Sequence, residues 1–231
     1  MPLLEGLKLR LDVDGVMRGQ GADPAILRAR NPRLYKIAER ALEEASRLFQ
    51  PQVLYRHLQI EKMVHNRVVL EGGVSLKGDL LGHLGASREV ILILCTIGPE
   101  LEEFARQVMA QDSIYGLALD GTGSAAVEAL ANAACNHFEN QAAARNWQTT
   151  IPLSPGMIGW DVKIGQPQIF DLLDSAQIGV SLDRGGYMLP LKSLSLILGL
   201  GPDLTDKGST CDYCSMKNIC RYQNHYAPIH T

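Results

Sequence analysis

EVILILCT, residues 89–96, is a continuous apolar run with the length of a β-strand. Apolar residues stand at both its odd and its even positions, which predicts a strand that is buried on both faces. Gly98-Pro99 ends the run, and apolar residues at three- and four-residue spacing then predict a helix over residues 101–109. We therefore expect a buried strand that is followed by an amphipathic helix.

Helical periodicity extends over long stretches on both sides of this run. Residues 34–49 follow the start signal Asn31-Pro32 and carry apolar side chains at three- and four-residue spacing. Residues 124–146 are rich in alanine, which predicts a strong helix with close packing. Shorter helices are expected over residues 113–119 and 167–173.

Strand-like segments occupy two separate parts of the chain. Residues 53–71 predict two strands, and three short strand-like pieces lie between residues 178 and 200. The first thirty residues predict an extended arm and a loop. Because the strands do not alternate regularly with helices, we predict an α+β fold with an antiparallel sheet. We expect one domain over residues 1–201 and a cysteine-bearing tail over residues 202–231.

Composition excludes several classes of protein. The chain has 231 residues, of which 46% are hydrophobic and 20% charged, so it is not a disordered protein. Its net charge of -3 gives no electrostatic case for binding nucleic acid. No apolar run approaches the roughly 18–20 residues of a membrane span, and no secretion signal is recognisable at the N-terminus. We therefore expect a cytoplasmic protein that binds neither nucleic acid nor membrane.

Three of the five cysteines crowd together near the C-terminus. Cys211, Cys214 and Cys220 form the pattern C-x2-C-x5-C, which suits a soft or borderline metal better than disulfides in a reducing compartment. The candidates are zinc and an iron-sulfur cluster. The alternative is a set of unligated thiols, which would be open to oxidation. The fourth ligand stays open among His225, Cys95, Cys135 and an exogenous group.

The segment LSPGMIGWD, residues 153–161, has the composition of a ligand loop. Proline fixes one torsion and glycine permits positive φ, so the backbone can curl and offer amide groups to a ligand, while the tryptophan could stack on a flat ring. The alternative is an ordinary loop that covers the core. The candidate ligand-binding residues are Pro155, Gly156, Met157 and Trp160, together with Tyr187 and Lys192 in the strand pair expected beside the loop.

Four segments, in this order, resemble the activation domain of cobalamin-dependent methionine synthase: TIGPELEEFARQVMA, LALDGTGSAAVEALANAA, LSPGMIGW and IFDLLDSAQIGVSLDRGGYMLPLKSLSLILGLG. The resemblance covers about residues 89–222 and is closest to small stand-alone relatives, some of which also carry a C-terminal cysteine cluster like CDYCSMKNIC. It implies a bent antiparallel sheet with helices around it.

The resemblance also implies a function. In that family the domain binds S-adenosylmethionine in a groove and supplies its methyl group when oxidised cobalamin is reduced by an external donor. Because the methylation is irreversible, it pulls an unfavourable reduction forward, and the domain mainly positions the reactants. The resemblance thus implies an accessory protein of corrinoid-dependent methyl transfer, and an electron-transfer role for the cysteines would favour an iron-sulfur cluster over zinc.

Partners would have to supply part of this chemistry. The chain has no D-x-H-x-x-G motif for cobalamin, so cobalamin would come on a corrinoid protein or a cobalamin-dependent methyltransferase. The electron donor would be a protein such as ferredoxin or flavodoxin.

The ligand loop departs from the family at two positions. The family reads R-x-x-P-G-Y, and Pro155-Gly156 matches its P-G, but Pro152 and Met157 stand at the arginine and tyrosine positions. Proline cannot pair with a carboxylate as arginine does. Arg145 or Arg184 would have to compensate, or the groove takes a different ligand or none. The alternative function is therefore a non-catalytic scaffold of a corrinoid methyltransferase system, with the cysteines holding a structural zinc.

Overall fold

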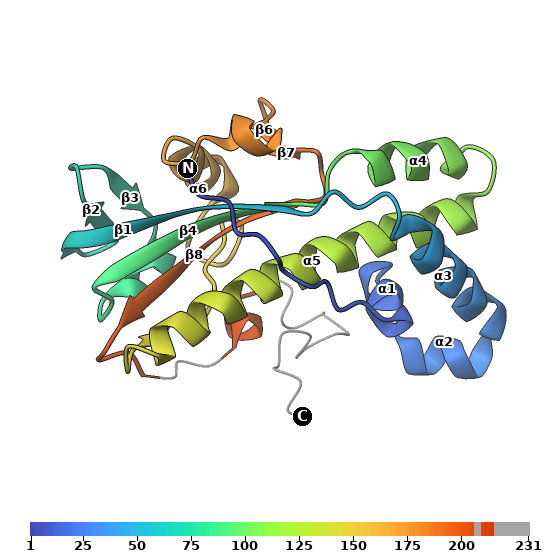
Figure 1. The fold of residues 1–231 in the computed structure, drawn as a ribbon, viewed down its shortest axis with the longest axis horizontal. Coiled ribbons are helices and arrows are strands. Elements are labelled where there is room, and N and C mark those ends of the chain that lie inside the picture. Colours follow the sequence, from blue (N-terminus) through green and yellow to red (C-terminus); the bar gives the residue numbers. More distant parts are fainter. Residues whose placement is uncertain (206–208, 215–231) are drawn as a thin grey trace.

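The computed structural model of the chain describes residues 1–205 and 209–214 and has one large antiparallel sheet with helices on both faces (Figure 1). The strand order is β3-β2-β1-β4-β8-β5, and every neighbouring pair is antiparallel. The strands are β1 (Gln52–Val64), β2 (Arg67–Leu70), β3 (Ser75–Lys77), β4 (Glu89–Thr96), β5 (Gln148–Thr149) and β8 (Ser193–Gly201). The predicted α+β class with an antiparallel sheet is confirmed.

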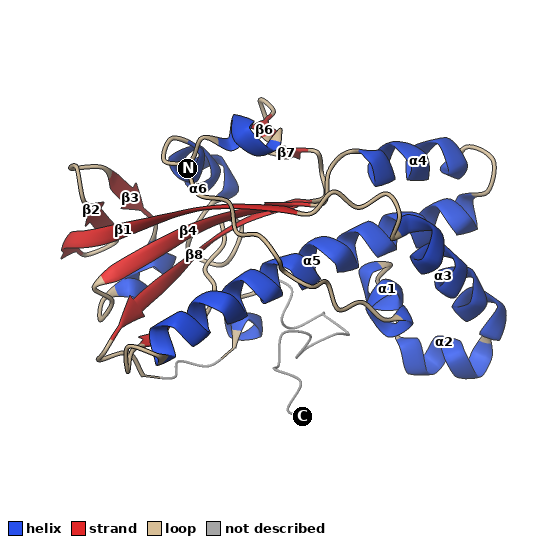
Figure 2. Cartoon of the chain, viewed as in Figure 1, coloured by secondary structure: helices blue, strands red, loops and turns tan. Residues whose placement is uncertain are grey.

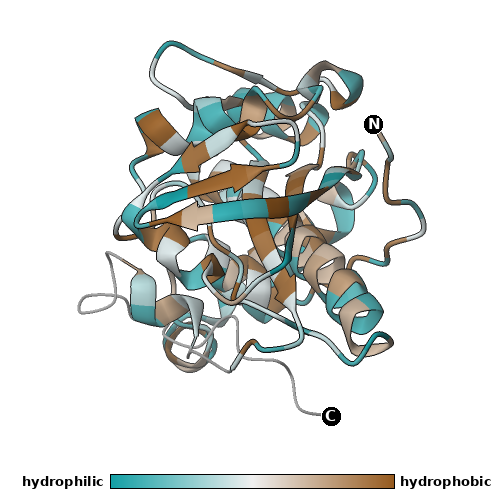
Figure 3. Cartoon of the chain, turned by 90° about the vertical axis from the view of Figure 1, so that its left-hand side faces the viewer, coloured by the Kyte–Doolittle hydropathy of each residue, from teal (hydrophilic) through white to brown (hydrophobic). Residues whose placement is uncertain are grey.

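Strand β4 lies at the centre, and all eight of its residues are buried. Its Leu92 pairs with Arg56 of β1 on one side and with Ile197 of β8 on the other. Because side chains alternate along a strand, Ile93 enters one hydrophobic core and Leu92 enters a second. The unbroken apolar run predicted this double burial, and Figure 3 shows hydrophobic segments along the strands.

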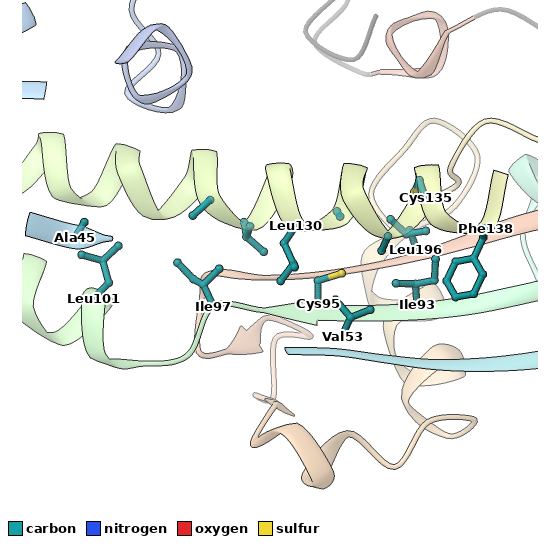
Figure 4. Close-up of a cluster of buried hydrophobic side chains, with 14 of the residues drawn as sticks. Ala45, Val53, Ile93, Cys95, Ile97, Leu101, Leu130, Cys135, Phe138 and Leu196 are labelled. Atoms are coloured by element: carbon teal, nitrogen blue, oxygen red, sulfur yellow. The ribbon is translucent and has the colours of Figure 1, made fainter. Parts of the chain in front are cut away.

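The first core lies between the sheet and the helix α5 (Ser113–Ala143), which is 31 residues long. Figure 4 shows Leu130, Cys135 and Phe138 of α5 lying against Ile93 and Cys95 of β4. Helix α4 (Glu100–Met109) packs beside α5.

Three further helices, α1 (Val13–Gly19), α2 (Pro24–Arg30) and α3 (Pro32–Ala45), gather around the first half of α5, beyond the end of the sheet (Figure 2). A small apolar cluster holds them together. Before α1, the N-terminal arm runs extended and its Leu4 N–H donates to the Val53 carbonyl at 2.9 Å.

The structure corrects the sequence-based prediction in two helical regions. Separate helices were expected over residues 113–119 and 124–146, but α5 is continuous, and Gly121 and Gly123 between them lie where α5 meets other side chains or backbone closely. The loop expected in the first thirty residues is largely helical, because Asp12 and Asp23 cap α1 and α2. A Cβ added to Gly19 would clash with the Gly121 carbonyl oxygen, so this glycine permits close helix packing rather than a turn.

The second core lies on the opposite face of the sheet, under short elements. These are η1 (Asp79–Leu84), α6 (Val162–Phe170), η2 (Ser175–Ile178) and the hairpin of β6 (Ser181–Leu182) and β7 (Met188–Leu189). Helix α6 begins five residues before the predicted start at Pro167, because the Asp161 carboxylate caps it by accepting from the Lys163 N–H at 2.7 Å. Within the described parts of the chain, no helix has the length and apolar content needed to cross a bilayer.

Candidate functional site

A cleft of about 690 Å³ opens beside the second core. Three parts of the chain form most of its lining: the turn at residues 77–79, the loop and helix start between residues 156 and 164, and the β6–β7 turn at Gly185 and Tyr187. This volume lies within the range of roughly 300–1,000 Å³ that is typical of small-molecule sites. The cleft is therefore large enough for a ligand with several functional groups.

Four of the six sequence candidates line this cleft, namely Gly156, Met157, Trp160 and Tyr187. Pro155 does not line it and lies close to Gly165 of α6. Lys192 is also absent from the lining, because its ammonium group pairs with Asp120 of α5 at 2.8 Å and donates to the Ser124 hydroxyl at 3.0 Å.

The loop curls back on itself through short backbone hydrogen bonds. The Gly156 N–H donates to the Trp160 carbonyl at 2.7 Å, and the Trp160 N–H donates to the Met157 carbonyl at 3.0 Å. Gly156 has a φ of 100° and Gly159 a φ of 90°, conformations that glycine adopts without strain. Leu153 exchanges two backbone hydrogen bonds with Ile197 of β8, which fixes the loop to the sheet.

Trp160 forms a rigid part of the cleft wall. Its side chain is 1% exposed and fits between Gly78 and Gly165, where an added Cβ would lie 2.4 Å and 2.8 Å from the indole. Its Nε1 is buried and has no hydrogen-bond partner among the described residues. By contrast, the Tyr187 side chain is 65% exposed. Tyr187 thus offers a more accessible ring than Trp160 for a flat ligand group.

Charges of both signs line the cleft. Lys77 and Lys163 contribute two ammonium groups, and Asp79 and Asp161 contribute two carboxylates. Asp79 accepts a hydrogen bond from the Asn66 side chain at 2.8 Å, so its position is fixed. This arrangement suits a ligand that carries an ammonium group and a carboxylate together.

The two arginines considered from the sequence do not line the cleft. Arg145 is bound at both guanidinium ends by Glu89, at 2.8 Å each, and stacks on Trp147. Arg184 lies exposed in the β6–β7 turn, next to Gly185. Over residues 1–205 and 209–214, Lys77 and Lys163 are therefore the cations that line the cleft.

The described part of the cysteine pattern forms a compact turn. The short helix η3 (Thr210–Tyr213) begins with Ser209 and Asp212 capping each other, and the Cys214 N–H donates to the Cys211 carbonyl at 3.3 Å. Cys220 and His225 lie outside the described residues. Over residues 1–205 and 209–214, no group of three or more possible metal ligands comes together.

Cys95 and Cys135 lie in the first core, on the other face of the sheet from the cluster that Tyr213 joins. Burial raises the pKa of the Cys95 thiol well above its ordinary value and that of Cys135 to about 12. Both are thus neutral core thiols, because burial disfavours the thiolate that a metal needs.

No family model and no curated protein matches this sequence. Solved structures do match it. One of them is the crystal structure of the MetH reactivation domain bound to AdoHcy, with a TM-score of 0.65 and 16% sequence identity over 92% of this chain and 83% of that one. The chain has the fold of the MetH reactivation domain. The predicted resemblance to the activation domain is confirmed at the level of the fold.

The MetH reactivation domain fold extends over the N-terminal part of the chain, where the sequence resemblance was loose. That part supplies cleft residues which sequence reasoning missed: Asn66, Lys77 and Asp79. Lys163 was also missed, although it lies only three residues after Trp160. No spacing or motif marks these residues. Asn66, Lys77 and Asp79 come close to the ligand loop and α6 through tertiary contacts, such as the Leu80–Gly159 hydrogen bond at 3.2 Å and the hydrogen bond that the Lys77 N–H donates to the Gln168 side chain at 3.1 Å.

Proposed function

We propose that the protein is an accessory protein of corrinoid-dependent methyl transfer that binds an S-adenosyl compound in the cleft. The observation that supports this most directly is the position of the cleft. It is built around the very loop that the sequence resemblance marks as the ligand loop, in a chain with the fold of a domain that binds AdoHcy, S-adenosylhomocysteine. Bound S-adenosylmethionine would supply a methyl group, and cobalamin would come on a partner.

The lining residues have the chemistry that such a ligand requires. The Lys77 and Lys163 side chains would hold the carboxylate, and the Asp79 and Asp161 carboxylates would face the ammonium group. The exposed ring of Tyr187 would stack on the adenine. The chain therefore mainly binds and orients the methyl donor, and the ligand and the partner's corrinoid carry the chemistry.

The rim of the cleft suits a protein partner. Ile164, which lines the cleft, and three further large apolar side chains in segments that flank lining residues, Ile158, Leu189 and Leu191, are between 44% and 58% exposed. Exposed apolar groups of this kind are typical of interaction sites. We propose that a corrinoid protein or a cobalamin-dependent methyltransferase docks here, so that its cobalt faces the cleft, and that ferredoxin or flavodoxin supplies electrons.

Titration calorimetry with S-adenosylhomocysteine and with S-adenosylmethionine tests the ligand. We expect a Kd in the micromolar range for the full-length protein and about a tenfold weaker Kd for Lys163→Ala, because the loss of one charge-assisted contact costs about 1.5 kcal/mol. Lys36→Ala, which removes an exposed lysine from α3, serves as the matched control and leaves the Kd unchanged. Heat changes indistinguishable from dilution would overturn the proposed ligand.

The C-terminal cysteines could hold a metal cofactor in addition to the ligand in the cleft. We propose that Cys211 and Cys214, together with Cys220, hold an iron-sulfur cluster that passes single electrons toward the partner's cobalt. Absorption spectra and metal analysis of protein purified without oxygen test it. Visible absorption with bound iron is expected, and a colourless protein with zinc and no iron would rule out electron transfer.

One observation favours a second function. Among the described residues no arginine lines the cleft, and Pro152 and Met157 replace two residues of the family's ligand loop. A protein with this fold that has lost S-adenosylmethionine would act as a scaffold for a corrinoid methyltransferase system, with a structural zinc on its cysteines. The same calorimetry separates the two, since a scaffold binds the partner but not the S-adenosyl compounds.

A further inference from the structure

The cysteine turn is attached to the ligand loop by a direct hydrogen bond. The Ile158 N–H donates to the carbonyl of Tyr213 at 3.1 Å. Ile158 stands between Met157 and Gly159, both of which line the cleft, and Tyr213 is the residue before Cys214. A backbone hydrogen bond therefore joins the chain segment that carries the thiols to the segment that forms the cleft.

The Tyr213 side chain strengthens this attachment. Its ring meets the ring of His83 edge-on, with centroids 4.4 Å apart and an angle of 69° between the planes. It also packs against the second hydrophobic core, to which Trp160 belongs. His83 is part of η1, the short helix that begins at the cleft residue Asp79. Tyr213 thus touches two of the segments that shape the cleft.

The turn itself is held in one conformation. Asp212 accepts from the Ser209 N–H at 2.9 Å, and the Cys214 N–H donates to the Cys211 carbonyl. A turn of this kind brings two cysteines three residues apart to the same small region. Thiolates bind borderline cations such as Zn²⁺.

We propose that Tyr213 is a positioning residue that couples a divalent, thiophilic cation on Cys211 and Cys214 to the conformation of the ligand loop. A cation that draws the two thiolates together alters the turn between them, and the Tyr213 carbonyl and ring transmit the change to Ile158 and η1. Coupling between two sites is reciprocal, so a ligand in the cleft also changes the affinity for the cation. The second half of this statement rests on the proposed function, whereas the first half does not.

The fluorescence of Trp160 can be used to follow the conformation of the ligand loop when no ligand is bound in the cleft. The chain has two tryptophans, so the Trp147→Phe variant leaves Trp160 as the only one, in the loop next to Ile158. Zn²⁺ is added to this reduced full-length protein while tryptophan emission is recorded. Zn²⁺ has a filled d shell and no redox chemistry, so an emission change reports a change around the indole. We expect a saturable change that is absent when Cys211 and Cys214 are both replaced by serine.

Three variants in the single-tryptophan protein separate positioning from folding. Tyr213→Ala is expected to bind Zn²⁺ but to lose most of the emission change. Tyr213→Phe keeps the ring and should restore the change, and the backbone carbonyl is present in both variants. Tyr35→Ala removes a tyrosine that contacts Arg28 in the helical part, and it should respond as the parent does. Circular dichroism checks that each variant is folded.

Two results would overturn the coupling or the site. An undiminished emission change in Tyr213→Ala means that the Tyr213 ring does not transmit the change, which overturns Tyr213 as the positioning residue, and unchanged Zn²⁺ binding in the double serine variant assigns the cation elsewhere. If Tyr213→Ala is unfolded, His83→Ala removes the ring contact from the other side and must lower the change for the coupling to stand. None of these measurements uses an S-adenosyl compound, so their failure is distinct from a failure of the proposed function.

Discussion

Glu89 shows how a single buried charge fastens the end of α5 to the sheet. Its carboxylate receives both ends of the Arg145 guanidinium at 2.8 Å and lies 2.7 Å from the His57 ring, while its side chain is 8% exposed. The hydrogen bonds from Arg145, more than any other contact, hold the pKa of Glu89 at about 2, against an ordinary value of 4.5.

The Glu89 pair gives a prediction with a definite sign. Because the pKa is depressed in the folded protein, the stabilisation is complete above pH 4.5 and is lost as the pH falls toward 2. Glu89→Gln should lower the free energy of unfolding by about 2 kcal/mol at pH 7 and by much less at pH 3. Urea unfolding at both pH values measures this. Asp203→Asn, which breaks the exposed pair with Arg88 at 3.5 Å, should change stability by less than about 0.5 kcal/mol.

At the residue scale, the sequence predicted candidates on the ligand loop better than their partners across the cleft. Gly156, Met157 and Trp160 share one curled segment, so a local pattern was enough to single them out. Lys77 reaches the same cleft from β3, which no local pattern predicts. Lys192 was predicted to contact the ligand. Side chains alternate between the two faces of a strand, but this pattern does not show which face meets the cleft, and the Lys192 side chain points toward α5.

At the element scale, the contact between α1 and α5 depends on glycines. A Cβ added to Gly121 would lie 2.4 Å from the Gln20 Cγ and 3.0 Å from the Val16 carbonyl oxygen. Alanine favours a helix over glycine by up to about 1 kcal/mol, but overpacking costs about 1–3 kcal/mol, so we expect Gly121→Ala to be destabilising. Gly82→Ala, where nothing lies within 4 Å, is the matched control and should be neutral. Equal thermal unfolding midpoints for the two variants would contradict the close contact.

The same glycines explain why some elements were predictable and others were not. Strands β4 and β8 follow from local sequence, since each is a short segment rich in Leu and Ile, and the structure buries almost all of both. The continuity of α5 does not follow from local sequence, because glycine is a poor helix former. Only the close packing of Gly121 against α1 and of Gly123 against Leu101 explains why glycines occupy these positions. Tertiary packing thus overrides the intrinsic propensity that a sequence pattern measures.

At the scale of the whole molecule, the four described cysteines divide between two environments that should differ in reactivity. Cys95 and Cys135 are buried in the core between α5 and the sheet, and burial raises the pKa of both thiols. Cys211 and Cys214 lie partly exposed at the surface turn. The thiolate is the form that reacts. Alkylation of the core pair therefore requires the whole sheet–helix unit to open, whereas alkylation at the turn requires only that the reagent reach the two thiols.

Alkylation of the reduced, metal-free protein with mass-spectrometric detection measures this difference. Cys211 and Cys214 should be modified in native buffer, and Cys95 and Cys135 only as urea unfolds the chain, with the same midpoint as the loss of circular dichroism. Gly121→Ala should shift the midpoint for the core pair to lower urea and leave the rate at the turn unchanged, because it weakens the helical framework without touching the second core. Modification of Cys95 in native buffer at the rate of Cys211 would show that the two faces of the sheet do not form one cooperative unit.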